Sequence, residues 1–441
     1  MKKKYAAIII TALLAASLTA CTGTQENRTS DNNQTTAAVT TAAQSSAETQ
    51  TEAQTEAQTE SNNDKKESTA TTANVTTDGA IDAGSMFTDR DMTQTAYTSS
   101  AQTFTLSDGQ NISITSAGVY VLKGNASNVT VTVDAASEDK VQIVLDGASI
   151  TNTSSPAVYV KSADKVFVTT LGSSSLSVTG SFIADGETNT DAVIFSKDDL
   201  VLNGTGTLAI SSTENGISGK DTVKITGGAI TIDCTADAVE ANDSIEIADG
   251  SITINSQKDG LHAENDEDDS AGYVYICGGT FSINASDDGI HATTIVQIDG
   301  GTFNITGAEG IEATWVQING GKINISASDD GINAANKSSK YSVLAEFNGG
   351  ETSIDMGQGD TDGVDSNGDI IINGGTISVN GQSTFDYDGK AEKNGGTIII
   401  NGTETDTISN QTMGGGMGGG MQPGGQMQGG MGGPGGQMQM R

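Results

Sequence analysis

The feature that most constrains this sequence is a short repeat in its central part. A Gly-Gly or Asp-Gly pair, followed by alternating apolar and polar residues, recurs with its second glycine at 228, 250, 279, 301, 321, 350, 375 and 396. The shorter steps are 20 to 22 residues, as from 301 to 321 and from 228 to 250, and the longer steps insert residues into the same unit. Three short β runs per unit, with almost no helical periodicity, predict one turn of a β-solenoid.

The β runs also predict where the core lies. Because they alternate apolar and polar residues, one face of each run should line a narrow core while the other faces solvent. Residues at the same place in successive units, such as Phe281, Phe303 and Ile323, should stack on one another. We therefore predict an all-β fold, a right-handed parallel β-helix with about 21 to 22 residues per turn, over residues 107–402.

The N-terminal segment indicates export. Three lysines at 2–4 precede an apolar run and then Leu18-Thr19-Ala20-Cys21, which is the layout of a secretory signal over residues 1–20. The cleavage sequence resembles the bacterial lipobox, in which the cysteine becomes the lipidated first residue. We expect Cys21 to carry a lipid anchor, and the alternative is an ordinary signal peptide with a chance cysteine.

The remaining segments outside the repeat predict linkers and a cap. Residues 21–80, rich in Ser, Thr, Gln and Glu, are too polar to bury a core and predict a disordered tether. Residues 81–106 are expected to cap the open end of the solenoid, and residues 403–441, rich in Gly, Met and Gln, to form a disordered tail. Together these segments predict an extracytoplasmic protein, lipid-anchored to the membrane and exposed at the cell surface.

The charge of the chain restricts its partners. A formal net charge of -35 excludes nucleic acid, whose binding depends on Lys and Arg, and favours cations. Cys234 and Cys277 should fall on different edges of the fold and about two layers apart, so no disulfide is expected between them. We expect both to be buried, unpaired side chains.

An acidic motif follows the Gly-Gly run in most units, usually as acidic-Gly-Ile-x-Ala. Stacked about 4.8 Å apart, these carboxylates repel one another by about 3 kcal/mol per neighbouring pair at an effective dielectric of 20. Calcium suits oxygen ligands drawn from several turns, so we predict Ca2+ as a cofactor. The predicted metal ligands are Asp237, Asp259, Asp287, Asp288, Glu309, Asp329, Asp330, Asp360, Asp362, Asp365, Asn367 and Asp369. The alternative is turn chemistry, because Asp-Gly is a common turn pair.

Strand parity predicts a second functional surface. Tyr273, Ile295, Trp315 and Leu344 fall in one column of opposite parity to the core valines, which places them outside the core. Exposed aromatic rings on a flat β wall are suited to stacking against sugars, with polar neighbours for hydrogen bonds. The predicted carbohydrate-binding residues are Tyr273, Tyr275, Trp315, Gln297 and Gln317. The alternative is a hydrophobic wall covered by an inserted loop.

The pattern from about Ser107 to Gly402 resembles a known family. It contains Ile114-Thr-Ser-Ala-Gly-Val-Tyr-Val-Leu, then Val144-Leu-Asp-Gly-Ala-Ser-Ile-Thr-Asn, and Ser-Asp-Asp-Gly-Ile at both 286 and 328. These motifs resemble the clostridial cell-surface carbohydrate-binding domains. The resemblance implies a calcium-containing, polysaccharide-lyase-like right-handed β-helix that binds cellulose and acidic, pectin-like sugars.

Catalysis has to be judged from the site residues, because parallel β-helices also include pectate lyases and polygalacturonases. A lyase needs a basic side chain, commonly Arg, to abstract a sugar proton, and no Arg lies between Arg90 and Arg441. The Gly-His-Gly and Arg-Ile-Lys motifs of polygalacturonases are missing. We expect a non-catalytic monomer that binds plant-type polysaccharide. The alternatives are a pectate lyase with Lys258 as its base, and a surface adhesin or scaffold with a protein partner.

Overall fold

The computed structural model describes residues 81–96, 99–357 and 361–411. Within these ranges the chain is all-β, with one short 3-10 helix, η1 (Ala83–Ser85). None of the described helices has the length and apolar character that crossing a membrane requires. The predicted signal sequence, Cys21, the tether and the part of the tail from residue 412 onward lie outside the described residues.

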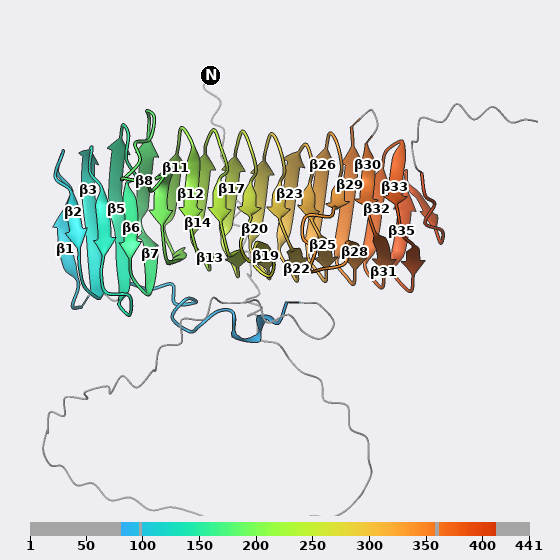
Figure 1. Ribbon diagram of the computed structural model, residues 1–441, viewed down its shortest axis with the longest axis horizontal. Coiled ribbons are helices and arrows are strands. Elements are labelled where there is room, and N and C mark those ends of the chain that lie inside the picture. The colour runs from blue at the N-terminus through green and yellow to red at the C-terminus, as the bar shows by residue number, and fades with distance from the viewer. Residues whose placement is uncertain (1–80, 97–98, 358–360, 412–441) are drawn as a thin grey trace, which may run out of the picture.

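Nearly all strands belong to three parallel ladders, in which each strand pairs with the equivalent strand of the next repeat (Figure 1). The first ladder contains β1 (Gln102–Thr105), β3 (Gly118–Ser127), β5 (Lys140–Asn152), β7 (Lys165–Leu171), β10 (Asp199–Gly204), β13 (Thr222–Ile225), β16 (Ser244–Ile247), β19 (Tyr273–Ile276), β22 (Ile295–Ile298), β25 (Trp315–Ile318), β28 (Leu344–Phe347), β31 (Asp369–Ile372) and β34 (Ala391–Lys393). The second ladder contains β8 (Ser173–Val178), β11 (Thr207–Ser211), β14 (Ala229–Asp233), β17 (Ser251–Asn255), β20 (Thr280–Asn284), β23 (Thr302–Gly307), β26 (Lys322–Ala327), β29 (Glu351–Met356), β32 (Thr376–Asn380) and β35 (Thr397–Ile400), followed by the antiparallel β36 (Thr403–Thr405). The third ladder contains β2 (Ile112–Ile114), β4 (Val131–Asp134), β6 (Val158–Ser162), β9 (Ala192–Ser196), β12 (Asn215–Gly219), β15 (Val239–Ala241), β18 (Leu261–Ala263), β21 (Ile290–Ala292), β24 (Ile311–Ala313), β27 (Ile332–Ala334), β30 (Asp362–Ser366) and β33 (Ser383–Tyr387).

The ladders are joined where strands are long. β5 is paired with both β7 and β8, so the first and second ladders merge there into one 24-stranded sheet, beside the 12-stranded third ladder. Each repeat contributes one strand to each ladder, which agrees with the three β runs predicted per unit. The predicted all-β, parallel architecture is therefore confirmed.

The core stacks as the alternation predicted. Phe281 pairs in register with Phe303, and Phe303 with Ile323, and all three are fully buried. The rings of Phe281 and Phe303 are nearly parallel, with centroids 4.4 Å apart. Parallel pairing with one repeat per layer thus places each apolar side chain on its own equivalent.

In the Gly-Gly pair at 300–301, the backbone requires each of the two glycines for a different reason. At Gly300 a Cβ would lie 2.6 Å from the carbonyl oxygen of Cys277, so the layer below leaves no room for a side chain. Gly301 has a φ of 109°, a conformation that other residues rarely adopt. The pair therefore marks the corner before each strand of the second ladder.

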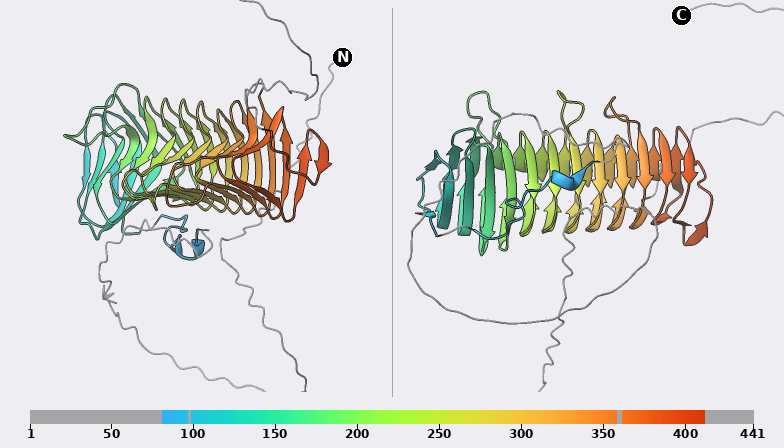
Figure 2. Two further views of the ribbon diagram at one scale, coloured as in Figure 1. Left: turned by 45° about the vertical axis from the view of Figure 1, so that its right-hand side comes forward. Right: turned by 90° about the horizontal axis from the view of Figure 1, so that it is seen from below.

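The predicted cap takes a different course. Residues 81–96, which we call the strap, lie along the outer face of the first ladder and not over the end of the stack (Figure 2). The backbone N–H of Ile81 donates to Gln297 Oε1 in β22, midway along the molecule. Of the strands within residues 81–106, β1 follows the strap and pairs with β3 at the N-terminal end. The prediction that all of residues 81–106 cap the end is thus wrong for the strap, because apolar side chains on the ladder's outer face offer it a larger surface to cover.

Truncating the stacked core should destabilise the fold. Phe303→Ala removes a fully buried ring that contacts Phe281, and we expect it to lower the free energy of unfolding by about 3 to 5 kcal/mol. Thr302→Ala, on the same strand but exposed, should change it by less than about 0.5 kcal/mol. Denaturant melts of both variants test this, and equal melts would show that the stack contributes little.

Candidate functional site

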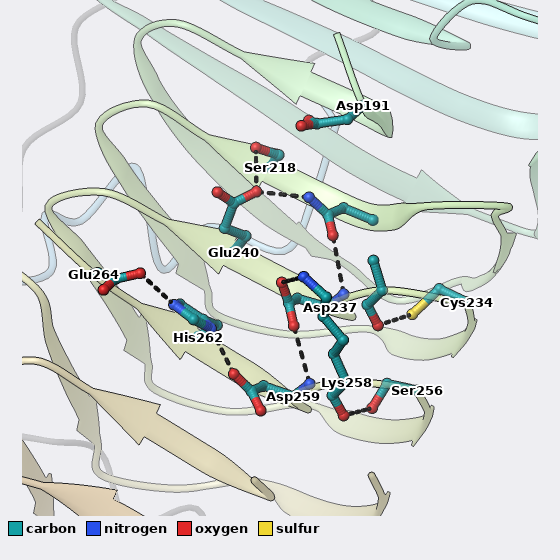
Figure 3. A network of polar contacts seen from close by, with 12 residues as sticks. Asp191, Ser218, Cys234, Asp237, Glu240, Ser256, Lys258, Asp259, His262 and Glu264 are labelled. Atoms are coloured by element: carbon teal, nitrogen blue, oxygen red, sulfur yellow. Dashed lines mark hydrogen bonds and ion pairs between the residues drawn. The ribbon is translucent and has the colours of Figure 1, made fainter. Parts of the chain in front are cut away.

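Two columns of polar side chains run along the third ladder, one at its turn and one on its outer face (Figure 3). The turn column comprises the polar residue two positions before the first core residue of each strand, which is followed by Gly or, at position 238, by Ala. Its members are Asn215, Asp237, Asp259, Asp288, Glu309, Asp330 and Asp362. The strand column follows the register of the ladder through Ser218, Glu240, His262, His291, Glu312, Asn333, Asp365 and Asp386. The strand column occupies the x position of the acidic-Gly-Ile-x-Ala motif.

Close packing explains the glycine of this motif. A Cβ at Gly310 would lie 2.4 Å from the carbonyl oxygen of Gly331 in the next layer. The chain therefore turns tightly here, and the preceding side chain is held against the layer above or below. This brings the acidic residues into one column.

Backbone amides satisfy part of the turn column. The N–H of Asp259 donates to Asp237 Oδ1 at 2.9 Å, and the N–H of Asp288 donates to Asp259 Oδ1 at 2.8 Å. Further along, the N–H of Asp362 donates to Asp330 Oδ1 at 2.9 Å. Each of these carboxylates thus accepts a hydrogen bond from the equivalent residue of the next layer, which lowers the cost of stacking them.

The two histidines supply positive charge between the carboxylates. His262 Nδ1 lies 2.5 Å from Asp259 Oδ2, and His291 Nδ1 lies 2.9 Å from Asp288 Oδ2 and 3.0 Å from Glu312 Oε2. Their rings stack with centroids 4.7 Å apart. Burial by itself would lower the pKa of His291, but its hydrogen bonds to both carboxylates raise that pKa to about 10. Protonated histidine thus neutralises the middle of the columns.

The charge balance changes at Glu309. Burial, followed by repulsion from Glu312 and Asp288, raises the pKa of the Glu309 carboxyl to about 8. Burial also raises the pKa of Asp330 to about 7, with Asp365 adding repulsion. Asn333 Nδ2 donates to both oxygens of Glu309, at 3.2 and 3.1 Å, but an amide brings no net charge. This part of the turn column is the least neutralised.

Three groups of side chains on the columns could hold a metal ion, with ligand atoms within 4.8 Å of one another. Two of them include a histidine, Asp237 with Asp259 and His262, and Asp259 with Asp288 and His291. The third, Asp288 with Glu309 and Glu312, offers only carboxylate oxygens, which are the ligands calcium prefers.

The structure separates several of the predicted metal ligands. Asp287 and Asp329 are exposed beside the turn column rather than within it. Asp362 and Asp365 lie at and within β30, whereas Asn367 and Asp369 follow its far end, about 13 Å or more from Asp362 at 3.3 Å per residue. The prediction that Asn367 and Asp369 are metal ligands together with Asp362 is wrong in this respect, because the extended strand β30 separates them. Asp360 lies outside the described residues.

The predicted aromatic wall is outside the core but is not exposed. Tyr273, Tyr275 and Trp315 form a cluster separate from the main core, with exposures of 2, 2 and 8%. Gln297 and Gln317 are also buried, and Gln297 accepts the Ile81 N–H. The parity argument is confirmed, but the expected open surface is wrong, because the strap covers it.

The two cysteines differ from each other. Cys234 is free and buried, as expected. Cys277 is only half-buried, so the expectation of a fully buried side chain is wrong for it. Because Cys234 is free, the structure agrees with the expectation that these two cysteines do not pair.

Polar residues that were not predicted as ligands contribute to the site. Glu312, His262 and His291 form its ion pairs, Lys337 lies 2.8 Å from Glu312, and Asn333 donates to Glu309. The signal was present in the sequence, since the x position of the motif is polar in every layer from Glu240 onward. Only the register could show that these side chains contact the turn column.

Two grooves flank an acidic insertion at residues 264–269, beside the columns. One groove is lined by the insertion together with His291, Thr293 and Lys337–Ser339. The other is lined by residues of the same insertion together with Lys220 and Glu240–Asp243. Both linings are rich in carboxylates and contain amides, and the first also has the hydroxyls of Thr293, Ser338 and Ser339, which suits a ligand with many hydrogen-bonding groups.

The stacked parallel strands, with grooves on a polar outer face, define the class of this protein. It is an all-β protein with a surface suited to binding a ligand. The sequence pattern of the family described as carbohydrate-binding domain-containing protein matches residues 108–363, more than half of the chain. The chain belongs to this family, and the resemblance predicted from its motifs is confirmed.

Two relatives illustrate the similarity. A carbohydrate-binding domain-containing protein of Acetivibrio thermocellus (strain ATCC 27405) is 35% identical over 124 residues, which is 27% of this chain and 43% of that protein. The matched segment thus spans less than half of the relative. A solved structure of the polysaccharide lyase-like protein from C. thermocellum, a gadolinium derivative, is 29% identical, with a TM-score of 0.42 over 51% of this chain and 93% of that one.

The raised pKa values predict that stability without added metal falls as pH rises. Glu309 and Asp330 bind protons in the folded state up to about pH 8 and 7, and His291 up to about 10, whereas unfolded Glu, Asp and His release theirs near 4.3, 3.9 and 6.5. Between pH 5 and 9 the folded state therefore binds more protons, and the free energy of unfolding decreases with pH.

Melting temperatures in chelator at pH 5, 7 and 9 measure this slope. Glu309→Gln should flatten it, whereas Glu187→Gln, an exposed residue in another loop, should leave it unchanged. A melting temperature that rises over this range would contradict the assignment.

Proposed function

We propose that this chain is a cell-surface lipoprotein that binds plant-type, acidic polysaccharide through the calcium-assisted acidic face of a right-handed, closed parallel β-helix. The observation that carries the proposal is the family match over residues 108–363, a range that contains the turn column from Asn215 to Asp362 and both grooves. A monomer anchored through lipidated Cys21 belongs to the same proposal.

The grooves support an acidic polysaccharide as the ligand. The carboxylates of the insertion, together with Asn265 and Thr293, offer hydrogen-bond acceptors and donors for sugar hydroxyls along an open groove. Lys220 and Lys337 add positive charge at the two grooves. Since most of the lining is negative, a polyanionic sugar needs a cation between its carboxylates and those of the protein.

The third carboxylate group fits calcium best. Asp288, Glu309 and Glu312 offer oxygen ligands only, and the raised pKa of Glu309 marks a charge that its neighbours do not neutralise. The other two groups fit calcium less well, because each includes a histidine nitrogen, whereas calcium prefers oxygen ligands. Bound calcium would supply positive charge to Asp288, Glu309 and Glu312 and to sugar carboxylates at the groove.

The alternative to a binding protein is an enzyme, a pectate lyase. Lys258, the base considered from the sequence, is mostly exposed and lies 4.0 Å from Asp237 Oδ2. Proton abstraction at the acidic face would produce unsaturated sugars that absorb ultraviolet light. Incubation with polygalacturonate and calcium, followed by absorbance, separates the lyase from the binder.

A glycan array with and without chelator tests the proposed function. Binding to polygalacturonate that is lost in chelator and restored by calcium is the expected result. Binding to no polysaccharide under either condition would overturn the proposal and favour an adhesin with a protein partner.

Calcium should also stabilise the fold, because an ion that binds only the folded state shifts the equilibrium by mass action. We expect excess chelator to lower the melting temperature at pH 8. Asp288→Asn with Asp330→Asn should reduce this effect, since fewer like charges then need a cation. The matched control is Asp287→Asn with Asp329→Asn, which removes two exposed neighbours. An unchanged melting temperature in chelator would remove calcium from the proposal.

A further inference from the structure

The outer face of the first ladder carries an aromatic wall beneath the strap. Tyr273, Tyr275, Ile295 and Trp315 form it, and Ile81 completes the buried cluster. Phe87 of the strap packs on Tyr275, with ring centroids 6.3 Å apart. The wall extends over three consecutive strands, β19, β22 and β25, which gives it the length of several sugar units.

The C-terminal half of the strap is held by a buried polar anchor. Asp91 is fully buried and lies 3.5 Å from Lys165 Nζ, and its carbonyl oxygen accepts a hydrogen bond from Thr226 Oγ1. Gln94 accepts the N–H of Gly204 and donates to the carbonyl oxygen of Thr226, both at 2.8 Å. This half of the strap is therefore fixed to β10 and the end of β13, away from the aromatic wall.

The N-terminal half rests on the wall chiefly through apolar contacts. Its hydrogen bonds to the described strands of the ladder include the Ile81 N–H to Gln297 Oε1, at 2.7 Å, and Lys224 Nζ to the carbonyl oxygen of Met86. Asp82, Gly84 and Ser85 are exposed. Residues 81–87 can thus lift from the wall while the anchor at Asp91 stays in place.

Two polar atoms beneath this half point to a ligand. Trp315 is more than nine-tenths buried, and its Nε1 finds no acceptor among the described residues. The hydroxyl of Tyr341, which packs against the same cluster, also has no partner in the described chain. A buried N–H without an acceptor is uncommon in folded proteins, and it is the group that a ligand hydroxyl would satisfy.

Acceptors at the edge of the wall define the ligand further. Glu246 Oε1 accepts the Tyr273 hydroxyl at 2.7 Å, Asp299 Oδ2 accepts the Tyr275 hydroxyl at 2.8 Å, and Glu346 accepts from Gln317. Carboxylates beside aromatic rings can accept hydrogen bonds from the hydroxyls at the edge of a sugar whose C–H face lies on the rings. The same carboxylates repel a uronate, so the wall suits a neutral sugar polymer.

We propose that residues 81–87 are a lid over a second carbohydrate site, in which Trp315, Tyr273 and Tyr275 stack against a neutral pyranose polysaccharide. The lid hinges between Phe87 and the anchor at Asp91. This site rests on the proposed polysaccharide-binding function but differs from the acidic face in place, in ligand charge and in its independence of calcium.

Opening the lid in the full chain tests the site. Ile81→Asp with Phe87→Ser removes two apolar contacts and adds a charge near Asp299, while the anchor and the core stay intact. Because Trp315 is the only tryptophan of the chain, its fluorescence reports the lid directly. We expect a red-shifted emission, stronger quenching by acrylamide, and at least tenfold tighter binding of cellohexaose in the presence of chelator.

The controls separate this site from the acidic face. Ile183→Asp places the same charge on an exposed isoleucine of another loop and should change neither fluorescence nor binding. Adding Trp315→Ala to the lid variant should abolish the gain for cellohexaose, while calcium-dependent binding of polygalacturonate stays as in the parent chain.

Two results would overturn the proposal that residues 81–87 are a lid. Unchanged tryptophan emission and quenching in the lid variant would show that residues 81–87 do not lift. A shifted emission with no gain in cellohexaose binding would show that the wall does not bind neutral sugar. In either case, the proposed function would stand if the protein still bound polygalacturonate. Failure of the parent chain to bind polygalacturonate would refute the proposed function separately.

Discussion

In-register parallel pairing at one repeat per layer is the constraint on which the rest of the structure depends. With strands about 4.8 Å apart, each side chain contacts its equivalents in the layers above and below. For apolar residues this is favourable, as the stacked rings of Phe281 and Phe303 show. For charged residues it is not, and every acidic position in the repeat becomes one member of a column of like charges.

The third ladder shows how the chain tolerates such a column. Backbone N–H groups donate to Asp237, Asp259 and Asp330, and the imidazole rings of His262 and His291 lie between neighbouring carboxylates. Near Glu309 these compensations end, and its pKa rises to about 8. The register that stabilises the core thus concentrates uncompensated negative charge at one place on the surface, which is where a cation has most to contribute.

The sequence predicted features that repeat and missed those that do not. Alternation of period two and the Gly-Gly spacing were enough to place Phe303 and Ile323 in one column and Trp315 outside the core, because each layer reports the same pattern. The strap has no equivalent in any other layer, so nothing in the repeat indicated that Ile81 joins Trp315 in one buried cluster. Likewise, the oxygen-rich segment from Asp362 to Asp369 resembled a binding loop, and only the course of β30 shows that its residues diverge.

The same register bears on how a polymer would bind. A chain of sugars lying along the stack meets equivalent groups in successive layers, so individually weak contacts act together once the first is made. On the acidic face such contacts would depend on charge, and therefore on salt and on the proposed calcium. On the aromatic wall they depend on ring surface, which must stay covered in water and therefore needs the strap. One repeat can thus present two chemically different surfaces, an acidic one on the third ladder and an aromatic one on the first, while both share a single register.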